Sequence, residues 1–255
     1  MLGTKAKTMR AAHAGAVWRI ASARMPTKWG TFDVIGFERD ISNGIARVET
    51  ALAIVLGDLT EGVPLLRIHS QCVTGELFGS LRCDCRDQLE MAMQAIAEEG
   101  RGLVIYEYQE GRGIGLMAKL EAYELQDAGL DTVEANHALG FKADCRDFGL
   151  PAAIVRDLGI KRVRLLSNNP RKASALAENG IEVSPVPCEA PPNPHSFAYL
   201  STKKERMGHA LSLRQGEAID QTRDKAVGSC RALHAGHHNG RIDVAWRGRG
   251  IEAQL

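Results

Sequence analysis

Three cysteines lie within fourteen residues of one another, at Cys72, Cys83 and Cys85, and their thiolates could hold a metal ion. Soft sulfur ligands favour Zn²⁺ over Mg²⁺ or Ca²⁺. No fourth cysteine stands nearby at the spacing of a zinc ribbon. Three protein ligands leave one tetrahedral position open, which is how a catalytic zinc holds the water that it activates. The spacing therefore predicts a catalytic zinc site.

Two alternatives remain open for these cysteines. A structural zinc site would use the same three thiolates and His69 as the fourth ligand. The cysteines could also be small buried residues that bind no metal. Neither alternative provides metal chemistry. The remaining cysteines, which lack metal-ligand spacing, are Cys145, Cys188 and Cys230.

Polar side chains gather around the cysteines. Arg67, His69, Ser70 and Gln71 follow an apolar run and lead directly into Cys72. Such a group at the end of an apolar strand is typical of the mouth of a site, and a solvated loop is the alternative.

Two further segments could bind an anion. Residues 109–116 (QEGRGIGL) combine Arg112 with glycines that allow a close approach of the backbone. Residues 167–172 (SNNPRK) place Lys172 in the first turn of an expected helix. The glycine run of the first segment does not match the Rossmann or P-loop spacing, and an ordinary capped helix is the alternative for the second segment. Asp144 and Arg146 are close enough in sequence to form an orienting pair or a surface ion pair.

These segments follow expected strands and precede expected helices, so the sequence predicts an α/β fold, a sheet with flanking helices in layers. Apolar runs and turn residues predict the strands, and helical spacing with Gly or Pro at the ends predicts the helices. The expected strands are 25–37, 46–56, 63–68, 103–108, 163–166 and 181–186, and the expected helices are 87–99, 116–128, 150–158, 170–179 and 196–213.

Composition limits the class of protein. The chain has 255 residues, 44% hydrophobic and 25% charged, and no apolar run approaches the ~20 residues that cross a bilayer. The net charge of +1 gives no argument for nucleic-acid binding. Residues 1–24 carry +5 and residues 214–255 carry +2, and we expect both to be flexible or disordered extensions. Residues 25–213 carry −6, so an anion site in this domain needs locally placed cations.

Together, six segments resemble GTP cyclohydrolase II, the first committed enzyme of riboflavin synthesis. The similarity runs from about residue 26 to about residue 211, with the motifs in the family's order. The segments are 67–88 (RIHSQCVTGELFGSLRCDCRDQ), 109–116, 131–136 (DTVEAN), 144–148 (DCRDF), 165–172 (LLSNNPRK) and 199–209 (YLSTKKERMGH).

The resemblance implies a mixed sheet with flanking helices and a zinc enzyme with one Zn²⁺ per chain. This enzyme converts GTP and water to 2,5-diamino-6-ribosylamino-4(3H)-pyrimidinone 5′-phosphate, formate and pyrophosphate, and Mg²⁺ assists at the triphosphate. The resemblance also implies a cytoplasmic homodimer that binds neither nucleic acid nor a membrane.

Each family motif implies roles for residues of this chain. Cys72, Cys83 and Cys85 fall on zinc ligands, Asp144 on the proposed proton acceptor, Arg146 on the proposed nucleophile and Tyr123 on an active-site tyrosine. The GTP-contacting positions are Arg67, Ile68, His69, Ser70, Gln71, Gln88, Glu110, Gly111, Arg112, Thr132, Ser167 and Lys172.

The chain departs from the family pattern at four positions. Glu76 replaces aspartate and Ser167 replaces threonine, and both keep the functional group. Gln71 replaces glutamate beside a zinc ligand, and Arg86 replaces glycine after the last ligand. Two alternatives to the full reaction therefore stay open: a paralogue that stops at the formylated, ring-opened intermediate, and a non-catalytic zinc-containing protein that binds nucleotides.

Overall fold

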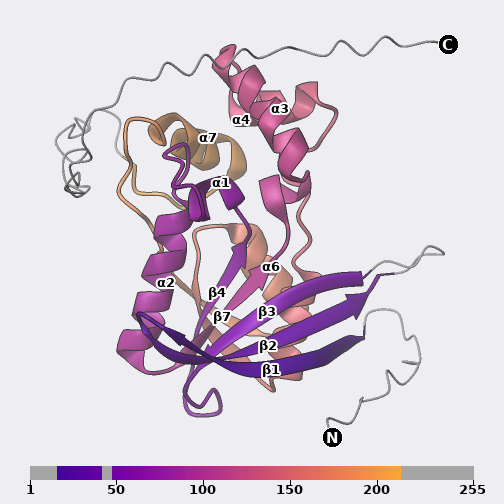
Figure 1. Ribbon diagram of the computed structural model, residues 1–255, viewed down its shortest axis with the longest axis vertical. Helices are drawn as coiled ribbons and strands as arrows, with labels where there is room; N and C mark the ends of the chain where they lie inside the picture. The colour runs from indigo at the N-terminus through magenta and orange to yellow at the C-terminus, as the bar shows by residue number, and fades with distance from the viewer. Residues whose placement is uncertain (1–15, 42–47, 214–255) are drawn as a thin grey trace, which may run out of the picture. The chain divides into compact units, whose positions relative to one another are not determined.

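The computed structural model describes residues 16–41 and 48–213, which form a seven-stranded sheet with helices on both faces (Figure 1). The strand order is β1-β2-β3-β5-β4-β6-β7. Within the described residues, no helix is long and apolar enough to cross a membrane. The strands are β1 (Val17–Thr27), β2 (Gly30–Asp40), β3 (Val48–Leu56), β4 (Leu65–Ser70), β5 (Gly102–Glu107), β6 (Arg162–Leu166) and β7 (Glu182–Val186).

The sheet is mixed, and its two halves differ in strand direction. β1, β2, β3 and β5 pair antiparallel, whereas β5, β4, β6 and β7 pair parallel. The expected fold class, an α/β fold with a mixed sheet in layers, is confirmed. The helices are α1 (Val73–Glu76), α2 (Cys85–Glu99), α3 (Leu116–Asp127), α4 (Thr132–Ala138), α5 (Gly149–Asp157), α6 (Pro170–Glu178) and α7 (Phe197–Met207), and a 3-10 turn, η1, spans Glu110–Gly113.

Two apolar cores hold the layers together, one on each face of the sheet. On one face, Met93 and Ile96 of α2 pack against Leu65 and Val104 of the central strands. On the other face, α5 and α6 cover the sheet. Ile154 of α5 belongs to the same apolar core as Leu66 of β4 and Leu103 of β5. Successive residues of β4 and β5 serve opposite faces, as the two-residue period of a strand requires.

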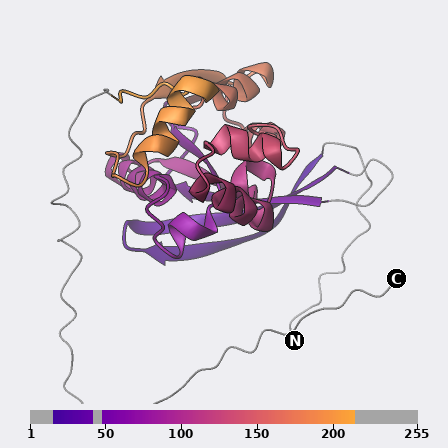
Figure 2. The ribbon, with the colours of Figure 1, turned by 90° about the horizontal axis from the view of Figure 1, so that it is seen from above.

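The carboxyl ends of β4, β5 and β6 lie at one edge of the sheet because these strands are parallel. In open α/β sheets this is the edge where ligands bind. α3, α4 and α7 pack together at this end of the molecule (Figure 2). The polar segments that follow the three strands therefore converge beneath these helices.

The structure differs from the sequence prediction at the start of the domain. Residues 17–24, which the charge pattern assigned to a flexible extension, form most of β1 and pair with β2. Their side chains are mostly exposed, so this edge strand lacks the alternating apolar pattern that predicts a half-buried strand. The helix expected over 196–213 ends at Met207. Residues 1–15 and the predicted extension at 214–255 lie outside the described residues.

Candidate active site

The three cysteines meet at the carboxyl end of β4. Cys72 precedes α1, Cys83 lies in the following loop, and Cys85 begins α2. Their Sγ atoms all lie within 4.8 Å of one another, and those of Cys72 and Cys83 are 3.7 Å apart. Tetrahedral Zn²⁺ with Zn–S bonds of about 2.3 Å separates its sulfur ligands by about 3.8 Å. The Cys72–Cys83 separation matches this value and Cys85 Sγ lies within 4.8 Å of both, so the three thiols could hold one Zn²⁺.

A basic side chain supports thiolate character in this cluster. Lys119 Nζ lies 3.2 Å from Cys72 Sγ and 2.8 Å from Glu110 Oε1. Hydrogen bonds from the thiols of Cys83 and Cys85 lower the pKa of Cys72, and the Lys119 charge lowers it further. Burial opposes the charge on Lys119, but the hydrogen bond to Glu110 and the negative charges of Cys72 and Glu110 together outweigh it and raise the pKa of the lysine.

Gly75 gives the sulfur atoms room. A Cβ at this position would lie 3.1 Å from Cys83 Sγ and 3.3 Å from Cys72 Sγ. Both distances are tighter than ordinary van der Waals contact, so a larger residue must displace a cysteine sulfur by a few tenths of an ångström.

We expect Gly75→Ala to weaken Zn²⁺ affinity about tenfold, the lower end of the effect of disturbing a ligand's support. Competition with a chromophoric chelator measures this affinity. Gly36→Ala is the matched control, because its Cβ would meet only Ala21 O, at 3.9 Å. Equal Zn²⁺ affinities of the Gly75 variant and the wild type would show that the sulfur atoms can accommodate the added methyl group.

His69 is not a fourth member of the cysteine cluster. Its Nε2 lies 3.0 Å from Glu76 Oε1, and Glu76 also accepts hydrogen bonds from Cys72 N at 2.7 Å and from Tyr106 Oη at 2.6 Å. Burial lowers the pKa of His69 to about 4, so the imidazole is neutral. Among the described residues, the group that could hold a metal contains only the three cysteines. This geometry argues against a structural site completed by His69.

Glu110 and Tyr123 flank the cysteines. Glu110 accepts hydrogen bonds from Val73 N at 2.7 Å, from Gly111 N at 2.9 Å and from Lys119. These bonds occupy both carboxylate oxygens. Tyr123 Oη lies 3.4 Å from Thr74 Oγ1, and burial raises its pKa, so the phenol keeps its proton.

Arg146 lies on the loop between α4 and α5 and forms a bidentate pair with Asp144, at 2.9 and 2.7 Å. Burial opposes ionisation of both groups. The pairing outweighs burial, so the pKa of Arg146 is raised and that of Asp144 is lowered. Arg146 Nη1 also lies 3.4 Å from Ser70 Oγ, at the end of β4. The guanidinium therefore stays charged and faces the strand ends.

Several contacts hold this loop, which we call the arginine loop (residues 142–148). Arg171 donates to the carbonyl oxygens of Asp144 and Arg146, at 3.2 and 2.9 Å. The side-chain amide of Gln109 bonds both backbone groups of Asp147, at 2.9 and 2.6 Å. The loop is thereby fixed to β5 and to the start of α6.

Lys172 and Arg67 are buried beneath the start of α6. Lys172 Nζ donates to Ile68 O at 2.8 Å, and Arg67 Nη1 donates to Leu166 O at 2.9 Å. Burial lowers the pKa of Lys172 well below its ordinary value, and the charges of Arg67 and Arg146 lower it further. These basic groups lie close together and repel one another, so an anion bound among them would relieve that repulsion.

Two adjoining cavities open among these groups. We call the first the cysteine cavity and the second the basic cavity, and both are open to solvent. Ser70, Cys85, Arg112, Arg146 and Tyr199 line both of them. One extended ligand could therefore reach from the cysteines into the basic cavity.

The predicted site residues divide between the two cavities. Ser70, Cys85, Arg112 and Arg146 line both. The cysteine cavity alone contains Gln71, Cys72, Cys83, Glu110, Gly111, Tyr123 and Thr132, and the basic cavity alone contains Arg67, His69, Gln88, Ser167 and Lys172. Asp144 lines neither cavity and pairs with Arg146, while the Ile68 side chain lies in the apolar core and its carbonyl oxygen accepts a hydrogen bond from Lys172.

The sequence prediction missed several lining residues. Lys119 lies four residues before Tyr123, so both face the cysteines from one side of α3. Tyr199 and Lys203 reach the site from α7, and Arg112 and Lys203 lie over the Tyr199 ring at 5.2 and 4.7 Å. In the sequence, Tyr199 and Lys203 appeared only within the motif at 199–209, which assigned them no role.

The fold and the site define an α/β enzyme that places a thiolate cluster beside a cavity for an anionic group. The family model for GTP cyclohydrolase II matches residues 18–186. A "GTP cyclohydrolase-2" from Shigella boydii is 52% identical over 196 residues, which cover 76% of this chain and 97% of that protein. The chain belongs to the GTP cyclohydrolase II family.

Two further similarities are partial. The "Riboflavin biosynthesis protein RibBA" of Cytophaga hutchinsonii is 51% identical over 204 residues, which cover 79% of this chain and 49% of that protein. The chain thus spans about half the length of this relative. A solved structure from A. baumannii, RibBX, "a two domain 3,4-dihydroxy-2-butanone 4-phosphate synthase", is 20% identical with a TM-score of 0.38 over 66% of this chain and 40% of that one. At that score the similarity is distant.

Proposed function

We propose that the chain catalyses the complete GTP cyclohydrolase II reaction of riboflavin biosynthesis. GTP and three waters would give 2,5-diamino-6-ribosylamino-4(3H)-pyrimidinone 5′-phosphate, formate and pyrophosphate. The observation that carries this proposal is the shared wall of the two cavities. It would place the guanine ring at the cysteines and the triphosphate among the cations.

We assign one Zn²⁺ per chain to Cys72, Cys83 and Cys85, because their sulfur separations fit this ion. When bound there, Zn²⁺ supplies Lewis-acid chemistry that makes hydroxide available at neutral pH. Opening the imidazole ring requires hydroxide to add at C8 of guanine, and a second hydration releases formate. The Lys119 ammonium helps to hold Cys72 in its thiolate form.

Tyr123 is the acid that we assign to the departing ring nitrogen. It keeps its proton at neutral pH and lines the cysteine cavity. Glu110 is the other candidate from the sequence, but its oxygens are already occupied by Val73, Gly111 and Lys119. The carboxylate therefore organises the site and keeps Lys119 in place.

Arg146 stabilises negative charge at the α-phosphate in this proposal. A nucleophilic guanidinium would have to lose its proton, and Asp144 would have to accept it. The pairing of these groups favours the opposite protonation states, because it raises the pKa of Arg146 and lowers that of Asp144. Geometry and charge together support electrostatic catalysis.

The basic cavity binds the phosphates in this proposal. Arg112 and Lys172 line it and supply counter-charge, and Mg²⁺ accompanies the triphosphate. Arg112 adopts a φ of 59°, a left-handed conformation that is uncommon outside glycine. This conformation turns the residue toward both cavities, so local strain accompanies a functional position.

The departures from the family pattern have separate explanations in the structure. Arg86 points away from the cavities and lies 3.5 Å from Glu90 on the exposed side of α2. It therefore leaves the cysteines undisturbed. Gln71 lines the cysteine cavity, so this substitution, unlike Arg86, can affect the reaction. It is therefore the departure that fits the alternative of a paralogue that stops after ring opening.

One incubation tests the proposal. The purified holoenzyme is incubated with GTP and Mg²⁺, and formate, pyrophosphate, nucleotide product and zinc content are measured. The complete reaction gives equal amounts of formate and pyrophosphate. A formylated product without formate would identify the paralogue, and GTP binding without either product would identify a non-catalytic protein.

Arg171→Ala should slow pyrophosphate release about 10- to 100-fold, because Arg171 holds the arginine loop and a small displacement of a reacting group is costly. We expect kcat to fall while KM for GTP changes little. Arg156→Ala is the control, since Arg156 is exposed and bonds only Asn179 among the described residues, at 3.4 Å. Unchanged kcat in the Arg171 variant would show that the arginine loop keeps its position without the hydrogen bonds from Arg171.

We also propose a cytoplasmic homodimer. Exposed apolar side chains near the cysteines, Leu77 and Phe78 at 73% and 79% exposure, would be covered by a second copy. The five described cysteines are all free, which fits a reducing compartment. Light scattering of the full chain tests the dimer, and Phe78→Asp should shift it toward the monomer.

A further inference from the structure

The turn after α7 brings a histidine to the basic cavity. Gly208 ends the helix with a φ of 66°, which lets the chain reverse. His209 N then donates to Lys203 O at 3.1 Å, and Ala210 N donates to Asn168 O at 3.0 Å. The backbone on both sides of His209 is therefore fixed, to α7 on one side and to the turn between β6 and α6 on the other.

The imidazole of His209 lines the basic cavity without a partner. Among residues 16–41 and 48–213, no group forms a hydrogen bond with its ring. The other histidine of this cavity, His69, is bonded to Glu76 at 3.0 Å. His209 thus has a fixed backbone and a free side chain, which is the arrangement of a residue that binds a ligand.

The surroundings of His209 define the class of that ligand. Arg67, Arg112, Arg146, Lys172 and Lys203 line the same cavity, and no acidic side chain of the described residues lines it. Burial lowers the pKa of His209 to about 3, and these cations, except Arg67, contribute. A neutral ring adds no repulsion to the cluster and still carries an N–H donor. A ligand with several negative charges fits this lining.

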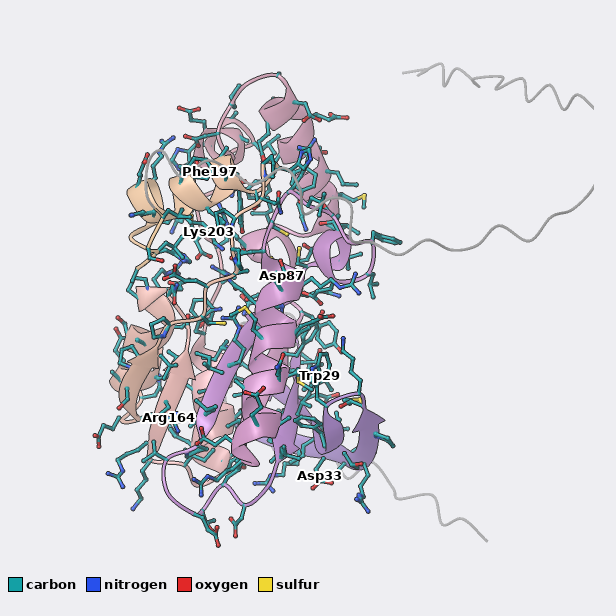
Figure 3. All side chains as sticks on the ribbon, turned by 90° about the vertical axis from the view of Figure 1, so that its left-hand side faces the viewer. Trp29, Asp33, Asp87, Arg164, Phe197 and Lys203 are labelled. Carbon is teal, nitrogen blue, oxygen red and sulfur yellow. The ribbon has the colours of Figure 1, made fainter. Side chains whose placement is uncertain are left out.

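α7 is fastened to the metal-binding loop, which keeps His209 in place. Lys203 Nζ lies 3.1 Å from Asp84 Oδ1, between two of the cysteines in sequence. Figure 3 shows Lys203 on α7 next to the start of α2, where Asp87 is labelled. The family model ends at residue 186, before this helix, and every GTP-contacting position implied by the motifs also precedes it. The segment 197–211 therefore adds a wall that those motifs do not describe.

We infer that His209 is a substrate-binding residue whose imidazole donates a hydrogen bond to the polyphosphate chain of the nucleotide. This inference rests on the proposed function, because the polyphosphate must occupy the basic cavity. The turn at Gly208 and the anchor at Asp84 would then serve to present this donor. α7 and the residues after it complete the phosphate end of the site.

The test measures binding and turnover of the zinc-loaded full chain with excess Mg²⁺. We expect His209→Ala to weaken calorimetric binding of inorganic tripolyphosphate about tenfold, the loss of one hydrogen bond to a charged group. KM for GTP should rise by a similar factor, with kcat within about twofold. His209→Gln keeps an N–H donor and should recover part of the affinity. His137→Ala is the matched control, since His137 is exposed on α4.

The possible results separate the two proposals. Wild-type protein that binds neither GTP nor tripolyphosphate would overturn the proposed function itself. Wild-type binding that His209→Ala leaves unchanged would overturn the role of His209 alone. Zinc content and the thermal midpoint are measured for every variant. A loss in His209→Ala that glutamine does not recover, with a lowered midpoint, would assign His209 a structural role and contradict the inference.

Discussion

Cys83→Ser should abolish formate release from GTP and remove most of the bound zinc. A serine hydroxyl is a hard, protonated ligand at neutral pH, whereas Cys83 contributes one of three sulfur atoms grouped within 4.8 Å. In the proposed reaction a metal held there would supply several kcal/mol of stabilisation to the ring-opening step. Because about 1.4 kcal/mol corresponds to a factor of ten, formate release should fall at least about 1,000-fold.

The control for this experiment is Cys145→Ser, an exposed thiol outside the cluster. Both variants receive the same measurements of zinc content, formate and thermal midpoint. Binding of tripolyphosphate to the Cys83 variant shows whether the rest of the site is intact, because Cys83 does not line the basic cavity. Full zinc occupancy with unchanged formate release would refute the metal assignment.

Arg146→Ala should reduce pyrophosphate release by about 1,000-fold, the upper end of the effect of removing one group that stabilises transition-state charge. The guanidinium is buried, paired with Asp144 at 2.7 Å, and placed on the wall between the two cavities. Arg146→Lys keeps the charge and loses the bidentate pairing, so it should retain more activity than alanine. Arg156→Ala again serves as the control for removal of an arginine.

Acid quenching followed by mass spectrometry distinguishes the two roles of Arg146. Electrostatic stabilisation predicts no covalent link between the protein and the nucleotide at any time during turnover. An arginyl-nucleotide adduct on the peptide that contains residue 146 would contradict that role and establish the guanidinium as a nucleophile. Normal pyrophosphate release by the alanine variant would exclude both roles.

The sequence predicted the elements with strong apolar patterns and missed those without. β5 has a nearly continuous buried run, and α6 has Asn169 as its cap and proline at its first position, so both were expected. β1 lies at the sheet edge with mostly exposed side chains, and its basic residues were interpreted as an extension. α4 has a complete capping box at Asp131 and Glu134, but seven residues are too few for a periodic pattern.

The site was predictable where chemistry follows directly from local spacing. The cysteines and the strand-end cations were found because their residue types are unusual at those positions. Lys119, Lys203 and His209 were missed because their contacts depend on how separate helices pack. Lys203 and Asp84 are 119 residues apart in sequence, and no local pattern reveals such a pair. Arg86 was counted among the departures from the family pattern that leave the full reaction open. Its side chain lies on the exposed side of α2, beside Glu90 and away from the site.

The connection between Asp84 and Lys203 sets an order of assembly for the growing chain. A nascent polypeptide that has emerged only as far as β7 already contains the three cysteines that we propose as metal ligands. The helix that closes the neighbouring cavity is still inside the ribosome at that stage. Under the proposed function, the capacity to capture an ion would therefore arise earlier in synthesis than the capacity to hold a nucleotide, and a product shortened at its C-terminal end would retain the first without the second.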